Sequence, residues 1–195
     1  MPIPESLLVD LAAAPRDRPI SLLMRHSNRF PITDPARNYE IGLTEEGVQL
    51  AVDLGSWMAA RFSLGRLHSS PVGRCVDTAN AIARGAGWAR RAVPHVYLSH
   101  DHIEPAWNCF SAGQVNGRLP SEVTTTLGFL LDHGGDGPVL DIHVTHDTVL
   151  GTLVGCLLRQ PVLDEHWPAF LEGALFWKDQ GEVCAVWRGQ AYRIG

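Results

Sequence analysis

A histidine between two arginines follows an apolar run near the start of the chain. The run is Ile20 to Met24, and the next residues read Arg25-His26-Ser27-Asn28-Arg29. Guanidinium groups suit the oxygens of a phosphoryl group because they can donate paired hydrogen bonds to them. A neutral imidazole is a nucleophile that can attack phosphorus. These residue types at this spacing therefore indicate a site where a histidine nitrogen attacks a bound phosphoryl group.

Two later segments place similar residues after other predicted strands. Arg74 follows Ser69-Ser70-Pro71, and His146-Asp147 follows a strand predicted over 139–145. In open parallel α/β sheets, ligands bind at the carboxyl ends of the strands. We therefore expect His26, Arg74 and His146 to meet at one edge of a sheet.

In this order along the chain, the three segments resemble the motifs of the histidine phosphatase superfamily. Residues 25–31 resemble its Arg-His-Gly-x-Arg-x-Pro signature, with Ser27 in place of the glycine. Residues 69–79 resemble its Ser-Ser-Pro-x-x-Arg-x-x-x-Thr-Ala block, and His146-Asp147 resembles its His-Asp element. The resemblance is closer to the acid-phosphatase branch than to the phosphoglycerate-mutase branch, whose polar stretch ending in Phe-x-Gly is not reproduced in 28–42.

The resemblance implies a metal-independent phosphatase that hydrolyses a phosphomonoester through a phosphohistidine on His26. The residues that it implies for holding the phosphate are Arg25, Arg29, Arg74 and His146. No cofactor is needed, because phosphoryl transfer is mainly a matter of positioning and charge stabilisation. A mutase-like phosphotransferase and a non-catalytic, phosphate-binding pseudophosphatase are the alternatives, although binding alone requires no nucleophile.

Two carboxyl groups are candidates for the acid that protonates the leaving group. Asp147 matches the acid-phosphatase branch, in which the residue after the second histidine serves this purpose, and its alternative role is that of a helix N-cap. Glu104 lies where the mutase-like branch often carries its acidic residue, and a solvated glutamate in a loop is the alternative reading. The sequence alone does not decide between them.

A cluster of possible metal ligands supplies a different enzyme mechanism. It comprises His100, Asp101, His102 and His143. His100-x-His102 is not followed by another ligand at a spacing typical of zinc sites. A metallohydrolase is therefore the second choice, and we expect no metal site.

The alternation of apolar runs with helical patterns predicts a three-layer α/β sandwich. Its central sheet is expected to be mostly parallel and flanked by helices, with a phosphoglycerate-mutase-like fold. The length of 195 residues fits one domain, 1–195, in which 100–120 is an irregular segment. Trp107, Phe110 and Arg118 on this segment can form a lid or substrate wall, or a plain packed loop.

The pattern also predicts the individual elements. Strands are expected at 19–24, 66–69, 92–98 and 139–145, and a hairpin at 174–188 around Asp179-Gln180-Gly181. Thr44 is expected to cap one helix, and Ser70-Pro71 to open another that runs to about residue 86. Further helices are expected at 121–133 and from Asp147 to about residue 159.

Composition narrows the class of partner. The net charge of -5 argues against a nucleic-acid binder, because affinity for the phosphate backbone depends on excess Lys and Arg. The N-terminus lacks the basic region of a signal peptide, and no apolar run approaches the length of a membrane span. A cytoplasmic location is therefore expected. The four cysteines include no Cys-x-x-Cys pair, so we expect free thiols. The family resemblance implies a small phosphorylated substrate. The oligomeric state is left open.

Overall fold

The protein is represented by a computed structural model that describes residues 2–114, 118–135, 137–159 and 167–194. Helices and strands alternate through much of the chain, and three consecutive strands close it. In chain order the elements are α1 (Glu5–Ala13), β1 (Ile20–Arg25), η1 (Pro35–Glu40), α2 (Glu45–Ala59), β2 (Leu64–Ser69), α3 (Gly73–Gly85), β3 (Val93–Pro94), η2 (Val96–Leu98), α4 (His100–Ser111), α5 (Ser121–Leu131), β4 (Leu140–Thr145), α6 (Asp147–Leu158), β5 (Gly173–Asp179), β6 (Glu182–Trp187) and β7 (Gln190–Ile194).

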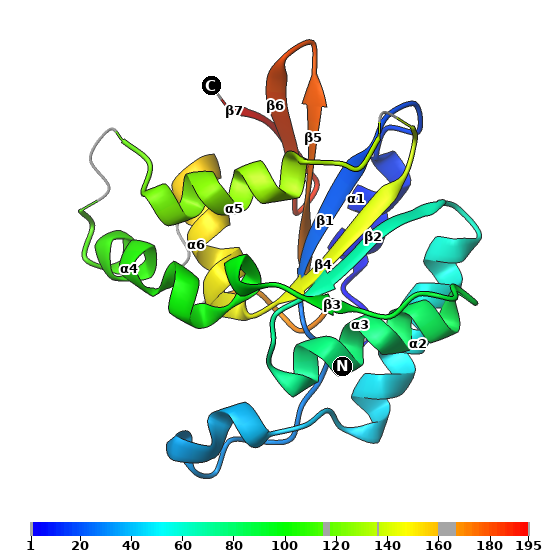
Figure 1. Ribbon diagram of the computed structural model, residues 1–195, viewed down its shortest axis with the longest axis vertical. Coiled ribbons are helices and arrows are strands. Elements are labelled where there is room, and N and C mark those ends of the chain that lie inside the picture. Colours follow the sequence, from blue (N-terminus) through cyan, green and yellow to red (C-terminus); the bar gives the residue numbers. More distant parts are fainter. Residues whose placement is uncertain (1, 115–117, 136, 160–166, 195) are drawn as a thin grey trace.

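The strands form one sheet in the order β3-β2-β4-β1-β5-β6-β7 (Figure 1). The pairs from β3 to β1 are parallel, whereas those from β1 to β7 are antiparallel. The prediction of a mostly parallel sheet is therefore only partly right, because the sheet is mixed. The predicted α/β architecture with flanking helices is confirmed.

Two short turns explain why β5, β6 and β7 are antiparallel to one another. Gln180 and Gly181 join β5 to β6, and both have positive φ (51° and 86°). Arg188 and Gly189 join β6 to β7 in the same way (49° and 76°). Two-residue turns of this conformation match the twist of adjacent antiparallel strands. The first hairpin was predicted, whereas β7 was not.

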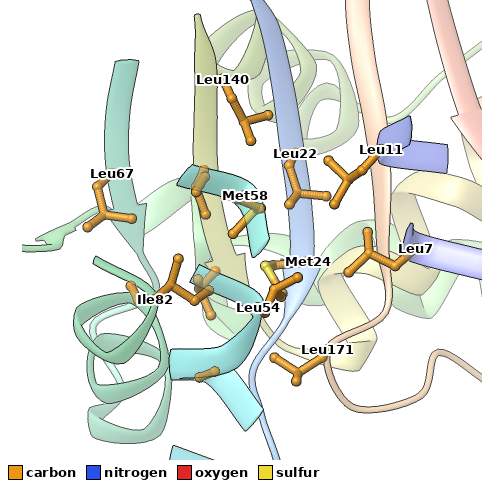
Figure 2. Packing of buried hydrophobic residues seen from close by; sticks show 14 of the residues in the cluster. Leu7, Leu11, Leu22, Met24, Leu54, Met58, Leu67, Ile82, Leu140 and Leu171 are labelled. Carbon is orange, nitrogen blue, oxygen red and sulfur yellow. The ribbon is translucent and has the colours of Figure 1, made fainter. Parts of the chain in front are cut away.

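Helices cover both faces of the sheet (Figure 1). The side chains of β1 alternate between them: Leu22 and Met24 join the core beneath α1, α2 and α3, and Leu23 joins the core beneath α4, α5 and α6. Figure 2 shows the first of these cores, where Leu54 and Met58 of α2 pack toward β1. Burial on both faces explains why β1 is apolar along most of its length. In β4, which is also buried throughout, apolar residues alternate with polar ones.

The irregular segment predicted at 100–120 is wrong over its first half, which forms α4. Ser99 caps this helix by accepting a hydrogen bond from the backbone N–H of His102. Pro105 lies inside the helix, as the sixth of its twelve residues. Because proline has no backbone N–H, α4 lacks one of its internal hydrogen bonds at this position. The rest of the segment includes residues 115–117, which lie outside the described residues.

The predicted helix starts are confirmed for α2 but not for α3. Thr44 Oγ1 accepts a 3.0 Å hydrogen bond from the N–H of Gly47, as expected of a cap. The helix expected to open at Ser70-Pro71 instead begins at Gly73. The Ser70 hydroxyl contacts His146 at 2.9 Å, so this serine contributes to a side-chain cluster rather than to a helix cap.

Candidate active site

The two histidines of the sequence motifs follow paired ends of adjacent strands. Arg25 ends β1 opposite Thr145, the last residue of β4. The backbone N–H of His26 donates to the carbonyl of Thr145 at 2.9 Å, which extends the pairing by one residue. The ring centroids of His26 and His146 consequently lie 5.7 Å apart. The strand register thus brings the two imidazoles together, as predicted.

His26 has a defined ring orientation and tautomer. Its Nδ1 lies 2.8 Å from the carbonyl oxygen of Ser27, which can only accept, so Nδ1 carries the proton. The unprotonated Nε2 then accepts a 3.1 Å hydrogen bond from Nε of Arg74. Burial lowers the pKa of His26 to about 3, with smaller contributions from Arg74, His146 and Arg25. The ring is therefore neutral near pH 7, with its nucleophilic lone pair on Nε2.

Ser27 fits where the superfamily signature has glycine, because its side chain and backbone are both held. Its Oγ donates to the Gly47 carbonyl at 2.6 Å, and its N–H donates to Thr78 Oγ1 at 3.0 Å. The turn also lies very close to α2, since a Cβ added at Gly47 would be only 2.1 Å from the backbone oxygen of Asn28. Helices α2 and α3 therefore fix the backbone that carries His26.

Arg74 connects the two histidines from the first turn of α3. Besides His26, it contacts Nδ1 of His146 at 3.3 Å, and its remaining terminal nitrogen donates to the Asn38 carbonyl at 2.8 Å. Burial lowers the pKa of Arg74 below its ordinary value of 12.5, but the guanidinium stays positive at neutral pH. Its guanidinium places positive charge directly beside the His26 nucleophile.

His146 takes the opposite tautomer to His26. Arginine can only donate, so Nδ1 of His146 accepts from Arg74 and Nε2 carries the proton toward Ser70 Oγ. Burial, with a smaller effect of Arg74, lowers the pKa of His146 to about 3. The buried Cys75 Sγ lies 3.6 Å from Nε2. Burial raises the pKa of this thiol to about 12, so Cys75 is not a competing nucleophile.

Arg25 is the second buried guanidinium of the site. It donates to the Pro168 carbonyl at 2.7 Å, forms a 2.8 Å ion pair with Asp147, and lies 4.0 Å from the centroid of the Phe170 ring. Its Nε is buried and has no hydrogen-bond partner among the described residues. Buried polar groups are nearly always paired, so this N–H is a donor available to a bound anion.

Asp147 is the first residue of α6 and lies directly at the site. Burial acts to raise its pKa, but Arg25 and hydrogen bonds from the Trp167 side chain and the Thr148 N–H outweigh burial. The net result is a pKa below the ordinary value. Asp147 is therefore ionised at neutral pH while it is paired with Arg25.

Of the two remaining predicted residues, Arg29 lies near the site and Glu104 does not contact it. Arg29 is half-buried, donates to the Phe30 carbonyl, and lies 5.9 Å from the Phe170 centroid. Its charge lowers the pKa values of both Arg25 and Arg74, which places it beside them. Glu104 is exposed on α4, and no hydrogen bond or ion pair joins it to these residues within the part of the chain that the structure describes.

The four possible metal ligands do not come together. His100 contacts Thr148 Oγ1 at 3.2 Å, whereas His102 faces the Glu122 carbonyl and Thr126. His143 is buried within β4. Over residues 2–114, 118–135, 137–159 and 167–194, no group of three or more His, Cys, Asp and Glu side chains is placed to hold a metal ion.

Sequence reasoning missed the contribution of the segment before β5. Trp167, Pro168 and Phe170 all contact residues of the motif cluster. Their spacing carries no motif, and they reach the site only because β5 pairs with β1. The Asn38 carbonyl that accepts from Arg74 was missed for a similar reason, since any residue type supplies a carbonyl.

Comparisons with known proteins bear on the family of this chain. The model of the histidine phosphatase superfamily (branch 1) matches residues 22–127, which include His26 and Arg74. His146 and Asp147, on which the likeness to the acid-phosphatase branch partly rests, lie beyond that match. No curated protein is similar enough in sequence to count as a match.

Solved structures share the fold at low sequence identity. YhfR of Bacillus stearothermophilus is 22% identical, with a TM-score of 0.59 over 88% of this chain and 97% of that one. A phosphoserine phosphatase of Entamoeba histolytica is 15% identical, with a TM-score of 0.55 over 86% and 95%. A phosphoglycerate mutase of Bacillus anthracis is 13% identical, with a TM-score of 0.51 over 95% and 93%.

At these identities the likeness establishes a phosphoglycerate-mutase-like fold. The family assignment rests on the match to the family model, which covers more than half of the chain. This match contains His26 and Arg74, two of the three residues that were predicted to meet at the sheet edge. The chain belongs to the histidine phosphatase superfamily.

Proposed function

We propose that this protein is a phosphatase that hydrolyses a phosphomonoester through a phosphohistidine on Nε2 of His26. The observation that carries the proposal is the neutral His26 ring, whose Nε2 lone pair meets a buried guanidinium at 3.1 Å. A phosphoryl group that replaces this contact has its phosphorus at the nucleophile and its oxygens at Arg74. The unpartnered Nε–H of Arg25 supplies a further donor.

The reaction has two steps. Nε2 attacks phosphorus, the bond from phosphorus to the ester oxygen breaks, and the departing oxygen takes a proton from an acid. Water then attacks the phosphorus and gives a proton to the acid that the first step left ionised. The bond from phosphorus to Nε2 breaks, and inorganic phosphate leaves with the original imidazole and acid restored. Arg25, Arg29 and Arg74 neutralise the equatorial oxygens in both steps.

We assign the acid to Asp147, because it is the candidate carboxyl that lies at the site. In the free protein Arg25 keeps it ionised. A bound phosphoryl dianion competes with Asp147 for the Arg25 guanidinium and also adds negative charge nearby. Both effects raise the pKa of Asp147. His146 holds the site together through Arg74 and Ser70, and a phosphoryl oxygen can take the place of Ser70 as the acceptor of its Nε2 proton.

The proposal extends to the setting of the reaction. Three arginines at the site supply the charge that a metal ion would otherwise provide, so we propose that catalysis needs no metal. The four cysteines are free, which suits a reducing compartment and supports the proposal of a cytoplasmic location. Among the described residues, no helix is long and apolar enough to cross a membrane.

The test is the His26→Ala variant. It should retain the fold, as judged by circular dichroism and thermal unfolding, and release no phosphate from substrates that the wild type hydrolyses. During turnover the wild type should carry acid-labile, base-stable phosphate that the variant lacks. A folded variant with normal turnover would remove His26 from the mechanism. Transfer of the trapped phosphate to a second alcohol in preference to water would instead favour a mutase.

A further inference from the structure

Three aromatic side chains extend from the phosphate-binding cluster toward α4. Phe170 lies 5.5 Å from the His26 ring and 4.0 Å from the Arg25 guanidinium. Trp167 hydrogen-bonds Asp147, and Trp107 of α4 meets Trp167 edge to face with ring centroids 5.4 Å apart. Each is partly buried and partly exposed. We call Phe170, Trp167 and Trp107 the aromatic wall.

The position of Asp147 shows which part of a substrate meets this wall. An acid must lie within hydrogen-bond reach of the oxygen that it protonates. If Asp147 is that acid, the leaving oxygen lies beside it, and the Trp167 side chain that bonds Asp147 is the next group outward. The carbon skeleton of the alcohol then passes over Trp167 and Trp107. This step rests on the proposed function.

The Trp107 side of the wall is held by the packing of α4 against α6. Trp107 contacts Phe110, with ring centroids 6.1 Å apart. Phe110 packs tightly against α6, because a Cβ added at Gly155 would lie only 2.2 Å from its ring. Helices α4 and α6 accordingly lie side by side (Figure 1), and Trp107 is fixed relative to Asp147 at the start of α6. A preformed aromatic surface binds flat apolar groups at low entropic cost.

The charges of the two helices argue against an acidic alcohol. Neither α4 nor α6 contains Lys or Arg, whereas both carry Asp or Glu. Arg25 and Arg74 are already engaged around the phosphoryl position, and Arg29 donates to the Phe30 carbonyl. A carboxylate on the alcohol, as in phosphoserine or phosphoglycerate, would find no cation on the helices that flank the wall.

We propose that the substrate is a phosphomonoester of an uncharged alcohol with an aromatic or flat apolar body, which stacks on Trp167 and Trp107. The alcohol is thereby recognised by stacking and apolar burial, whereas the phosphoryl group is recognised by the arginines. Aromatic pairs in offset or edge-to-face arrangements contribute binding free energy beyond that of surface burial alone. Trp107 then determines specificity without contacting the phosphorus.

The test compares substrates whose leaving groups have similar pKa values. For the wild type, kcat/KM for 2-phenylethyl phosphate should exceed that for glycerol 1-phosphate by about tenfold or more, and O-phosphoserine should be the poorest of the three. Trp107→Ala should reduce the ratio of the first two values by about tenfold, mainly through KM for the aromatic substrate. Trp107→Phe should retain most of the ratio.

The control is Trp57→Ala, which removes a tryptophan that lies on Arg61 in the opposite helical layer. It should leave the ratio unchanged, because a ratio of two substrates does not depend on the fraction of folded protein. Equal wild-type kcat/KM values for the three substrates, or a Trp107→Ala ratio equal to that of the wild type, would overturn the inference. If the phosphohistidine is still trapped in that case, the proposed function stands. Failure of the wild type to release phosphate from any of the three, with no trapped phosphate, would overturn both.

Discussion

Arg25 and Asp147 form a 2.8 Å ion pair that joins the last residue of β1 to the first residue of α6. The pair orients the Arg25 guanidinium over Phe170 and keeps the Asp147 carboxylate at the edge of the phosphate-binding cluster. It also couples two charges that the reaction must use in different ways. Arg25 must stay positive to hold phosphate, whereas Asp147 must gain a proton before it can give one to a leaving group.

This pair predicts a dependence on the leaving group for Asp147→Asn. Alkyl phosphates need a proton on the departing oxygen, so their kcat/KM should fall on the order of 100-fold or more. p-Nitrophenyl phosphate loses a phenolate that needs little help, so its value should fall by about tenfold or less. Steady-state kinetics with both substrates measure the difference.

Glu104→Gln is the matched control for this prediction. Glu104 is exposed on α4, so its neutral variant should show nearly wild-type values with both substrates. A large loss with alkyl phosphates in Glu104→Gln, together with a small one in Asp147→Asn, would transfer the acid role to Glu104.

Catalysis should survive exhaustive treatment with a chelator. Positive charge is already present at the site, because Arg25 and Arg74 both act to lower the pKa of His26 and the charge of Arg29 reaches both arginines. Vanadate should inhibit by mimicking the five-coordinate phosphorus. Phosphate release before and after chelation is the measurement, and activity that disappears and returns only with zinc or manganese would contradict the expectation.

Replacement of Arg74 should lower the rate of the chemical step more than it lowers the stability of the fold. Arg74→Lys keeps the charge but loses the planar group that reaches His26, His146 and the Asn38 carbonyl together. We expect kcat to fall on the order of 100-fold, the usual effect of removing one donor that stabilises a transition state. Rapid-quench measurement of phosphoenzyme formation tests this. Arg84→Lys, on the last turn of the same helix, should be nearly silent.

The protein should lose stability in mild acid. Burial lowers the pKa of His143 well below its ordinary value, and the pKa values of His26 and His146 fall to about 3. The unfolded chain takes up protons at about pH 6.5, whereas these folded groups do not. The stabilising contribution is therefore complete above about pH 6.5 and shrinks as the pH falls. At pH 5, the free energy of unfolding should be lower than at neutral pH by about 2 kcal/mol for each of His26 and His146.

His143 offers a separate check, because it lies away from the phosphate-binding cluster. Its ring stacks on His68 at 5.3 Å, and its two nitrogens have no hydrogen-bond partner among the described residues. His143→Met keeps a similar volume and removes one titrating group. Urea unfolding at pH 7.5 and pH 5.0 should show a smaller loss of stability for the variant. An equal loss in both proteins would exclude His143 as a source of acid sensitivity.

Sequence predicted the fold best where one physical signal dominated. The strands at 20–25 and 140–145 are buried on both faces. Apolar residues fill most of the first strand and recur at every second position of the other, so both were found to within about one residue. α4 was missed because Pro105 and the polar residues around it mask the cap at Ser99. β7 was missed because this short strand is largely exposed and lacks an apolar pattern.

The same distinction applies to the site. His26, Arg74 and His146 were predicted together because each follows a strand, and parallel strands bring such residues to one edge. Glu104 was expected in an irregular segment, but helix α4 carries it on an exposed face. Trp167 and Phe170 gave no signal, since their contacts depend on the antiparallel pairing of β5 with β1.

That pairing divides the two kinds of recognition between separate parts of the chain. The arginines and histidines lie at the ends of β1 and β4 and in the first turn of α3, whose positions are set by the core of the sheet. The aromatic residues lie on α4 and on the link between α6 and β5, outside the sheet. Substitutions in these outer segments can therefore alter which alcohol is accepted while the core-anchored chemistry stays intact. Selection for new substrates would act mainly on α4 and this link.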